Sequence, residues 1–574
     1  MLALVASTEI ASAAPTEANG RSSSPSVSVD GRFLAFGSAS TNLVSGDTNG
    51  VEDIFVRDRG TGATLRVSMS SGGAQANGNS YNPAISSNGN FVAFESDASN
   101  VVGGDTNGTR DIFRRDRSTG TTILVSVSSG GAIGNGLSSG AAISSDGRYV
   151  AFSSSASNLV SGDTNAAGDI FIRDVTAGTT TRLSVNSGGA QANGASSTPA
   201  ISANGRYVAF TSWASNLVTG DTNNGYDVFV RDTSAGTTTR ESVGAGGAQG
   251  NAWASFNPSI SSDGRFVAFS SQATNLVTGD TNGLTDVFVR DRTAATTSRV
   301  SVSSSGGQAT GGSSYAPVTN SWISHDGRFV VFQSDATNLV SGDSNGVRDV
   351  FERDRTTGST RRMSFDDWKG QGNARSTSGA ISGDGSTAAY MSDATNLLAF
   401  IDANQVTDIL IHVFDFARTF CFLGKASVPD FGSQATLTQP EAGQTVYRVW
   451  GGGAREDGGS WTPVDPRTLG PDQFRIEAGL PDRLNDGTTL TIGVLRDASK
   501  VNQVRASLPV NPLQDPAPGP AYRSYPGGLV EYVILDVPGA IDILSRVPQN
   551  PAYGGPPAGC TPSIPPARGC VGER

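Results

Sequence analysis

The 574-residue chain has few charged residues, few cysteines and few histidines. Charged side chains make up 16 % of it, against about 25 % in an ordinary globular protein, which argues against a coiled coil or a long helical bundle. Three cysteines exclude a disulfide-dense scaffold; Cys560 and Cys570 could pair or remain free thiols. The two separate histidines, His325 and His412, argue against structural zinc, which usually needs four Cys or His ligands.

Long apolar runs and positive charge are also missing. No run of 18 apolar residues occurs, so no membrane-spanning helix is expected. The net charge of −11 disfavours a stable nucleic-acid partner, because phosphate binding needs a positive surface. Residues 2–6 are apolar and Ala11-Ser12-Ala13 resembles a cleavage site, but no basic residue precedes Arg21. We therefore interpret residues 1–24 as a weak or truncated export signal and leader, and expect a secreted or cell-envelope protein.

Glycine is abundant, with 72 residues, and much of it belongs to a repeat. The glycines have no three-residue period, which excludes collagen. A Gly-Asp-Thr-Asn phrase marks the repeat, and its aspartates are spaced by 58, 58, 58, 59, 63 and 59 residues up to a degenerate seventh copy. These aspartates are Asp47, Asp105, Asp163, Asp221, Asp280, Asp343 and Asp402. Such a period indicates tandem structural units.

Each repeat contains four strand-like segments. In the second copy these are residues 84–86, 91–96, 111–115 and 122–127, separated by Gly- and Asn-rich turns. Four short antiparallel strands in each of several units predict a β-propeller, in which radial closure leaves few exposed sheet edges. The expected fold is mainly β: a six- or seven-bladed propeller over residues 25–416, followed by a small α+β domain.

The repeat also resembles a known family. Ser145-Asp146-Gly147-Arg148-Tyr149-Val150-Ala151-Phe152-Ser153-Ser154 resembles the PD40, or TolB-like, β-propeller repeat, and related phrases recur through residues 25–416. The resemblance implies a TolB-like propeller. It does not imply one function, because such propellers serve binding, scaffolding and catalysis alike.

The marker loop carries side-chain oxygens at its first, third and seventh positions. In the first three copies these residues are Asp47, Asn49, Asp53, Asp105, Asn107, Asp111, Asp163, Asn165 and Asp169, and three later copies continue the pattern. Calcium prefers six to eight hard oxygens, so each loop could hold one calcium ion. The alternative is an Asx turn, in which these side chains bond nearby backbone N–H groups. Unlike an EF-hand, the loop has no glutamate at position 12.

Two further sets of residues could contact a ligand. A Gly-rich loop repeats a glutamine that could offer an amide to a ligand or belong to a tight inter-blade connection: Gln75, Gln191, Gln249, Gln308 and Gln371. Four tryptophans without a shared register suit blade packing, with carbohydrate stacking as the alternative: Trp213, Trp253, Trp322 and Trp368.

The composition changes near residue 416, where the repeat stops. We interpret residues 417–440 as a linker, 441–545 as a compact domain with a short helix at 472–478, and 546–574 as a Pro/Gly-rich tail. No histidine follows His412, which excludes a Ser-His-Asp triad or a His-ligated zinc hydrolase within this region.

Three motifs of the C-terminal region resemble those of a toxin family. They are Tyr447-Arg448-Val449-Trp450-Gly451-Gly452-Gly453, Ser460-Trp461-Thr462 and Gly527-Gly528-Leu529-Val530-Glu531. Their order is similar to that of TreTu-type mono-ADP-ribosyltransferase toxins of bacterial polymorphic toxin systems, within the Arg–Ser–Glu class. The class often carries a second acidic residue or glutamine two positions before the glutamate, where this chain has leucine.

The resemblance implies roles for these residues with NAD as the substrate. Arg448 would hold the pyrophosphate, Ser460 and Thr462 would order the nicotinamide side, and the glycines after Trp450 would let the backbone approach the cofactor. Glu531 would stabilise the oxocarbenium-like state as nicotinamide leaves. The alternatives are a buried ion pair between the arginine and the glutamate, and a cap or turn role for the serine.

Two functions follow from this sequence. The first is an exported toxin-like protein whose propeller presents a C-terminal domain that transfers ADP-ribose from NAD to a macromolecular target, expected to be a protein, with an immunity protein as a further partner. The alternative is a non-enzymatic extracellular or envelope propeller that acts as a protein- or glycan-binding scaffold. A hydrolase site in the propeller channel has less support, because no repeat carries an odd nucleophile–base pair.

Overall fold

The computed structural model describes most of the repeat region and six strands beyond it. The described residues are 7–10, 18–252, 255–314, 322–365, 370–397, 406–413, 445–450, 460–461, 489–495, 501–506, 530–534 and 541–548. The chain divides into two compact units, one over Val5–Phe414 and the other over Met1–Leu4 with Asp415–Arg574.

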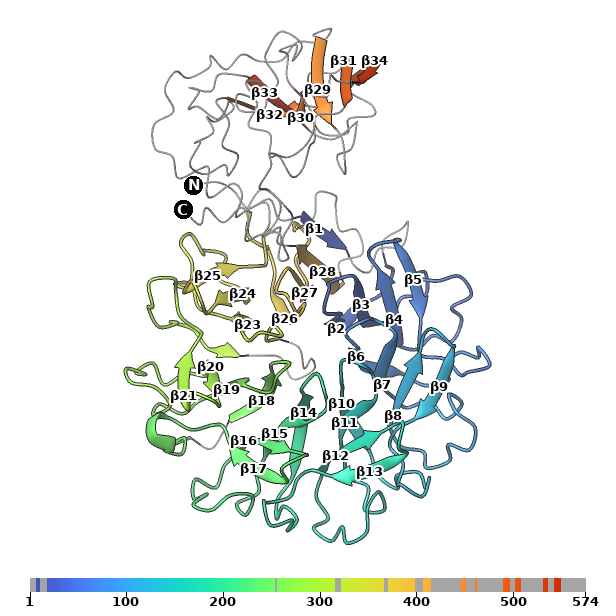
Figure 1. Ribbon diagram of the computed structural model, residues 1–574, viewed down its shortest axis with the longest axis vertical. Coiled ribbons are helices and arrows are strands. Elements are labelled where there is room, and N and C mark those ends of the chain that lie inside the picture. Colours follow the sequence, from blue (N-terminus) through green and yellow to red (C-terminus); the bar gives the residue numbers. More distant parts are fainter. Residues whose placement is uncertain are drawn as a thin grey trace. The chain divides into compact units, whose positions relative to one another are not determined.

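The first unit is a seven-bladed β-propeller, so the expectation of six or seven blades resolves to seven (Figure 1). Each blade is a four-stranded antiparallel sheet, and in blades 1 to 6 the strands follow chain order. Blades 1 to 3 consist of β2 (Ser22–Val27), β3 (Phe33–Ser38), β4 (Asp53–Asp58) and β5 (Ala63–Arg66); β6 (Ser80–Ile85), β7 (Phe91–Ser96), β8 (Asp111–Asp116) and β9 (Thr121–Leu124); and β10 (Ser138–Ile143), β11 (Tyr149–Ser154), β12 (Asp169–Asp174) and β13 (Thr179–Arg182).

The remaining blades follow the same plan. Blades 4 to 6 consist of β14 (Ser196–Ile201), β15 (Tyr207–Ser212), β16 (Asp227–Asp232) and β17 (Thr237–Arg240); β18 (Ser255–Ile260), β19 (Phe266–Ser271), β20 (Asp286–Asp291) and β21 (Thr296–Arg299); and β22 (Ser313–Ser314), β23 (Phe329–Ser334), β24 (Asp349–Asp354) and β25 (Ser359–Arg362). Blade 7 contains β26 (Ser376–Ile381), β27 (Thr387–Ser392) and β28 (Asp408–Val413). A short 3-10 helix, η1 (Ala245–Gly247), precedes blade 5.

A strand from the start of the chain completes blade 7. β1 (Ser7–Ile10) pairs antiparallel with β28, from Ser7 opposite Val413 to Ile10 opposite Leu410. The last blade therefore joins segments from both ends of the propeller. The interpretation of residues 1–24 as a leader did not foresee a blade strand there, because its partner lies about 400 residues away.

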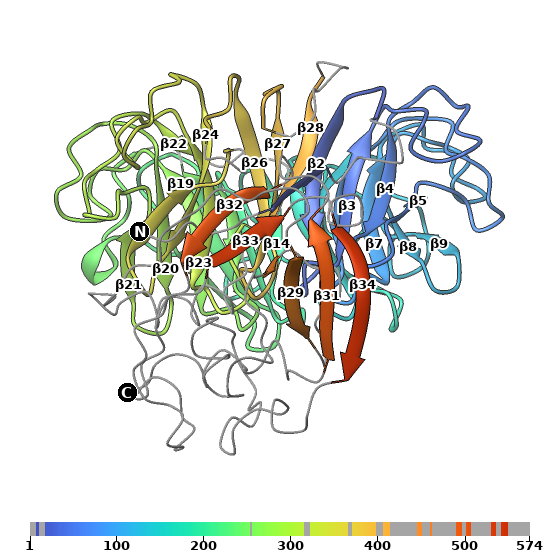
Figure 2. The same ribbon diagram turned by 90° about the horizontal axis from the view of Figure 1, so that it is seen from above.

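The hydrophobic core lies between neighbouring blades. The second and third strands of each blade are buried on both faces because each sheet packs against two others, and Figure 2 shows these stacked sheets after a quarter turn. Between blades 1 and 2, for example, Ile54 and Val56 pack in one cluster with Val92 and Phe94. Within blade 2, the rings of Phe94 and Phe113 stack across the strands with centroids 5.8 Å apart.

A glycine turn fits each blade against the one before it. Gly89, between β6 and β7, has a φ of +73°, and a Cβ there would lie 2.2 Å from the Phe33 ring of blade 1. Any side chain would therefore both strain the turn and separate the blades.

The C-terminal unit contains two three-stranded antiparallel sheets among the described residues. One joins β29 (Thr445–Trp450), β31 (Thr489–Leu495) and β34 (Ile541–Pro548); the other joins β30 (Ser460–Trp461), β33 (Val530–Ile534) and β32 (Val501–Ala506). The linker at 417–440, the helix expected at 472–478 and the cysteines of the tail lie outside the described residues. Within the described segments, no helix has the length and apolar character needed to cross a membrane.

Candidate functional site

A closed ring of seven backbone hydrogen bonds surrounds the channel of the propeller. The residue that follows the first serine of each inner turn donates its N–H to the carbonyl of the equivalent residue in the next blade, at 2.9 to 3.2 Å. Blade 7 donates to blade 1, so the ring closes. Its members are Val29, Ser87, Ser145, Ala203, Ser262, His325 and Gly383. The ring satisfies these backbone groups and leaves the side chains to define the channel.

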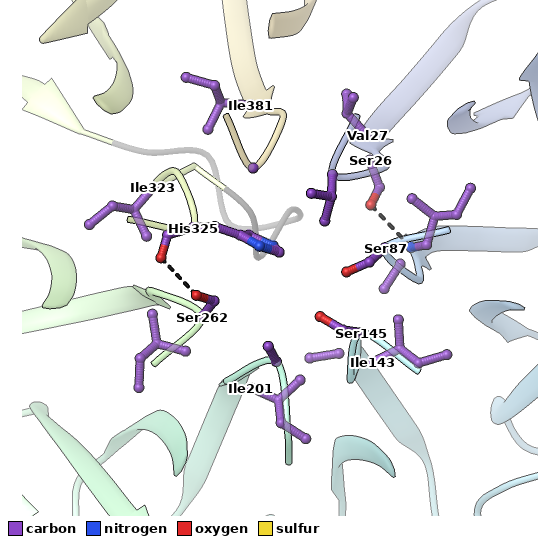
Figure 3. A pocket seen from close by; sticks show the side chains of 17 residues that line it. Ser26, Val27, Ser87, Ile143, Ser145, Ile201, Ser262, Ile323, His325 and Ile381 are labelled. Atoms are coloured by element: carbon purple, nitrogen blue, oxygen red, sulfur yellow. Dashed lines mark hydrogen bonds between the residues drawn. The ribbon is translucent and has the colours of Figure 1, made fainter. Parts of the chain in front are cut away.

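His325 is the one titratable residue in the described lining of this channel. Its imidazole points into the middle of the ring, and Ser262 Oγ donates to its backbone carbonyl at 3.0 Å (Figure 3). Gly383 leaves room for the imidazole, because a Cβ there would lie 2.9 Å from His325 Cγ. Burial lowers the pKa of His325, so the imidazole is neutral at pH 7. The cavity of about 90 Å³ is small, which suits water more than a substrate.

The repeated acidic loop holds an arginine in blades 1, 3, 4, 5 and 6. In blade 1, Arg66 Nη1 lies 3.0 Å from Asp47 Oδ1 and 3.3 Å from Asp53 Oδ2. In blade 3, Arg182 lies 3.5 Å from Asp163 and 3.7 Å from Asp169. The equivalent arginines of the other three blades are Arg240, Arg299 and Arg362. A guanidinium thus already neutralises the carboxylates that were predicted to bind calcium in these loops.

The repeated asparagines and glutamines complete these loops. Asn49 Nδ2 donates to Asp53 Oδ2 at 2.7 Å and to the carbonyl of Ala76 at 3.1 Å. Gln75 Nε2 donates to the carbonyl of Gly46 at 2.7 Å. In blade 3, Asn165 likewise donates to Asp169. These side chains join the acidic loop to the Gly-rich loop of the same repeat, and Asn49 Oδ1 accepts from the N–H of Val51 at 3.4 Å, as in an Asx turn.

Blade 2 differs from its sister blades. Leu124 and Ile133 occupy the positions of Arg66 and Gln75, so Asp105 and Asp111 share their loop without a guanidinium. Asp111 accepts from Ser126 Oγ at 2.5 Å and from Asn107 Nδ2 at 2.6 Å. Burial raises the pKa of Asp111 to about 6, and burial also raises the pKa of Asp105. Within the described residues, no group of three or more His, Cys, Asp or Glu side chains could hold a metal ion, and calcium binding stays a prediction.

An exposed aromatic pair distinguishes blade 4. Trp213 is 49 % exposed, and its ring centroid lies 5.1 Å from that of Tyr226. The same two repeat positions form ion pairs in blades 2 and 6, as between Arg110 and Asp97 at 2.9 Å. Of the other three tryptophans in the propeller, Trp322 is fully buried in the core, and Trp253 and Trp368 lie outside the described residues. Blade packing was the expectation for all four tryptophans of the propeller, with carbohydrate stacking as the alternative, and nothing in the sequence distinguished Trp213 from the others.

The structure places the C-terminal candidate residues on three strands that contact one another in turn. Arg448 lies on β29 opposite Thr491, and β29 contacts β30. Ser460, on β30, pairs with Val533 of β33, two residues from Glu531. Gly451, Gly452 and Thr462 lie outside the described residues. The backbone therefore brings together the strands that carry the arginine, the serine and the glutamate.

Comparison with known proteins yields similarity in fold alone. No family model matches the chain, and no curated protein matches it. Among solved structures it is similar to a putative TolB from Agrobacterium tumefaciens, with 17 % identity, a TM-score of 0.31 and coverage of 52 % of this chain and 88 % of the other. It is also similar to an oligogalacturonate lyase in complex with manganese, with 11 % identity, a TM-score of 0.42 and coverage of 71 % of this chain and 96 % of the other. A third similar structure is the β-propeller domain of the Trilobed protease from Pyrococcus furiosus, with 9 % identity, a TM-score of 0.41 and coverage of 69 % of this chain and 95 % of the other.

Proposed function

We propose that the propeller is a binding scaffold that presents an exposed aromatic site to a macromolecular partner, a protein or a glycan, in the cell envelope or outside the cell. The observation that carries this proposal is the Trp213–Tyr226 pair. A propeller suits this role because its rigid blades hold surface positions in place while their side chains vary.

The four-stranded sheet of a blade does not require an aromatic pair at these positions. Blade 2 and blade 6 use charged residues at the same positions, as in the 2.7 Å pair between Arg348 and Asp335, and these blades have the same four-stranded sheet. An aromatic ring left half in water gains only part of the free energy of burial. Tryptophan and tyrosine combine a large apolar face with a polar atom, which makes them frequent anchors of binding sites.

The experiment exchanges the aromatic pair for the ion pair of blade 2. The double variant Trp213→Asp/Tyr226→Arg keeps a pairing that the repeat already tolerates, so we expect its melting temperature to stay near that of the wild type. Calorimetric titration of the full chain with chitohexaose, cellohexaose, maltohexaose and a set of aromatic-rich peptides measures binding. We expect at least one probe to bind the wild type and to bind the double variant at least about tenfold more weakly. Equal binding by both proteins, or no binding of any probe, would contradict the proposal.

A second candidate function is ADP-ribosyl transfer from NAD by the C-terminal unit. It is favoured because β29 contacts β30 and β30 pairs with β33. In this proposal Arg448 binds the pyrophosphate, Ser460 orders the nicotinamide side and Glu531 stabilises the positive charge that develops as nicotinamide leaves. The propeller would then present this unit to its protein target.

Nicotinamide release by the full chain tests this second candidate. We expect release from NAD by the wild type and by a control variant, Glu441→Ala, which removes an acid outside the three motifs. Glu531→Ala should lower the rate by about 100-fold, in line with the loss of one group that stabilises transition-state charge. No release by the wild type with any target lysate would refute the transferase while leaving the scaffold proposal intact.

A further inference from the structure

Most junctions between neighbouring blades contain an arginine bound to the turn glycine. The guanidinium donates to the carbonyl of that glycine at 2.5 to 2.8 Å in five junctions. The pairs are Arg59 with Gly31, Arg117 with Gly89, Arg114 with Gly147, Arg292 with Gly264 and Arg355 with Gly327. This carbonyl is therefore a recurrent acceptor for a guanidinium.

In four of these junctions the same guanidinium also lies over an aromatic ring of the preceding blade. Arg117 lies 4.8 Å from the Phe33 centroid, and Arg292 lies 4.9 Å from that of Tyr207. Arg114 over Phe91 and Arg355 over Phe266 complete the set, at 4.6 and 4.5 Å. Each junction thus binds its guanidinium through one carbonyl and one ring face.

The arginine belongs to different strands at different junctions, but its guanidinium occupies the same position beside the turn glycine. Arg117, Arg292 and Arg355 each follow the last aspartate of a third strand. Blade 3 has Val175 at that position, and there Arg114 of blade 2 reaches the same place from the other side, bonding Gly147. Two routes to one location indicate that the location itself favours a guanidinium.

The junction between blades 3 and 4 lacks this guanidinium. Thr233 stands at the position of Arg292, and Ile172 stands at that of Arg114. Thr233 Oγ1 lies 3.5 Å from the carbonyl of Gly205, at the long limit of a hydrogen bond. A cavity of about 470 Å³ lies here, lined by Tyr149, Gly205 and Thr233 among others.

The charges around the cavity permit a cation. Its three lining arginines are engaged: Arg206 pairs with Asp232 at 2.8 Å, Arg182 lies 3.5 Å from Asp163, and Arg231 donates to the carbonyl of Asn186 at 3.1 Å. At the next junction the equivalents of Arg206 and Arg231 are Arg265, which pairs with Asp291, and Arg290, which lies 3.9 Å from the same Glu241 that Arg292 bonds. Asp174, also in the lining, is paired with Arg148 at 2.6 Å, as its equivalent Asp232 is paired with Arg206 at the next junction.

An ion pair with the guanidinium is not a general requirement of these sites. Arg292 does bond a carboxylate, Glu241, at 2.9 Å. Arg117 has no ion pair among the described residues, and its guanidinium still occupies the position above Phe33. The cavity at blade 4 offers the equivalent carbonyl and ring. Arg148 lies 4.8 Å from the Tyr149 centroid, as Arg32 lies 4.8 Å from that of Phe33, and the Phe33 ring also carries Arg117.

We propose that the cavity between blades 3 and 4 binds the guanidinium group of an external ligand. The guanidinium lies over the ring of Tyr149 and donates to the carbonyl of Gly205, as the chain's own arginines do in the sister junctions. Its source is an arginine side chain of a partner polypeptide or a small guanidinium compound, which share this chemistry. The inference does not rest on the proposed function, because it uses different residues of the propeller.

Calorimetric titration of the full chain tests the site with defined probes. The probes are N-acetylarginine amide, methylguanidinium, an arginine-containing hexapeptide and, as the competing cation, N-acetyllysine amide. We expect the guanidinium probes to bind at one site and the lysine probe to bind at least about fivefold more weakly, because an ammonium lacks the planar fork of donors. Tighter binding of the hexapeptide than of methylguanidinium indicates a polypeptide source, and the reverse indicates a small compound.

Three variants separate this site from nonspecific cation binding. Thr233→Arg supplies an internal guanidinium, so it should abolish binding and raise the melting temperature. Tyr149→Leu keeps an apolar residue but removes the ring face, and should weaken binding at least about fivefold. Arg292→Thr opens the matched cavity over Tyr207 and should add a second binding site. Unchanged binding in Thr233→Arg, or no binding of a guanidinium probe by the wild type, would overturn the proposal.

Discussion

Blades 1 and 2 carry the same acidic loop but neutralise it differently. In blade 1, Arg66 reaches Asp47 and Asp53 from the fourth strand. In blade 2 the fourth strand ends in Leu124, and burial raises the pKa of Asp111 to about 6. In blade 1 an ion pair favours the charged carboxylates, whereas in blade 2 burial without a cation favours the protonated form of Asp111.

This difference shows that the loop motif does not determine its own electrostatics. The three oxygen-bearing residues occupy equivalent positions in both blades, and Asn107 bonds Asp111 as Asn49 bonds Asp53. The counter-charge arrives from a strand outside the motif. One residue on the fourth strand therefore decides whether a guanidinium already occupies a loop whose sequence resembles a cation site.

The largest effect is expected from removing the arginine of blade 1. Arg66→Leu leaves two buried carboxylates without a cation, so it should lower the free energy of unfolding by about 3 kcal/mol at pH 8. The loss should be smaller at pH 5, where a carboxyl can take up a proton. Urea denaturation measures both values. The control Arg32→Ala breaks an exposed pair with Asp58 and should cost less than about 1 kcal/mol, and similar losses in the two variants would refute the distinction.

The converse substitution should stabilise blade 2. Leu124→Arg supplies the missing guanidinium at the position that Arg66 holds in blade 1, and we expect a gain of about 1 kcal/mol at pH 8 after the loss of some apolar packing. Urea denaturation beside the wild type measures the gain. A destabilised variant at pH 8 would show that the acid pair of blade 2 needs no counter-charge.

The pH dependence of stability should differ between wild type and Asp111→Asn. A carboxyl whose pKa rises on folding stabilises the protein below its unfolded pKa, near 4, and this contribution disappears as the pH rises through about 6. The wild type should therefore lose about 1 kcal/mol more than the variant between pH 4 and pH 7. Burial raises the pKa of Glu352 to about 7 in both proteins, so their difference isolates Asp111. Parallel curves would refute the shift.

The smallest effect concerns calcium. The sequence-based calcium prediction is tested most sharply in blade 2, where no guanidinium competes for the carboxylates of Asp105 and Asp111. It predicts that millimolar calcium raises the melting temperature of the wild type by about 1–2 °C and leaves Leu124→Arg unchanged. An equal shift in both proteins, or none in the wild type, would remove blade 2 as a calcium site.

Local patterns predicted the strands well where alternation is regular. Residues 91–96 form β7 with the expected bounds. The strand expected at 84–86 begins earlier, at Ser80, because a register shift between Tyr81 and Ala84 interrupts its alternation, and Asn82 has a φ of +46°. In the C-terminal unit, residues 445–450 and 489–495 form the expected strands, whereas β32 and β34 were not foreseen.

The candidate sites were less accessible from the sequence than the strands. Blade 7 lost the repeat phrase, and its fourth strand comes from residues 7–10, so the number of blades stayed open until the pairing of β1 with β28 was known. The aromatic pair of blade 4 joins two residues that flank different strands: Trp213 directly follows β15, and Tyr226 directly precedes β16. Each residue alone resembles an ordinary packing residue.

The sequence by itself determined the repeating unit, its four strands and its turns, because these depend on contacts between residues close along the chain. The 58-residue period and the glycine turns already specify a propeller. Only the tertiary structure decided which groups meet within a blade and between blades: the arginine that neutralises an acidic loop, the ring of backbone bonds around His325 and the cavity beside Tyr149. The arginine meets its carboxylates when one blade folds, whereas the ring bonds join residues of neighbouring blades and, between Gly383 and Val29, of the last and first blades, which meet only when the propeller closes.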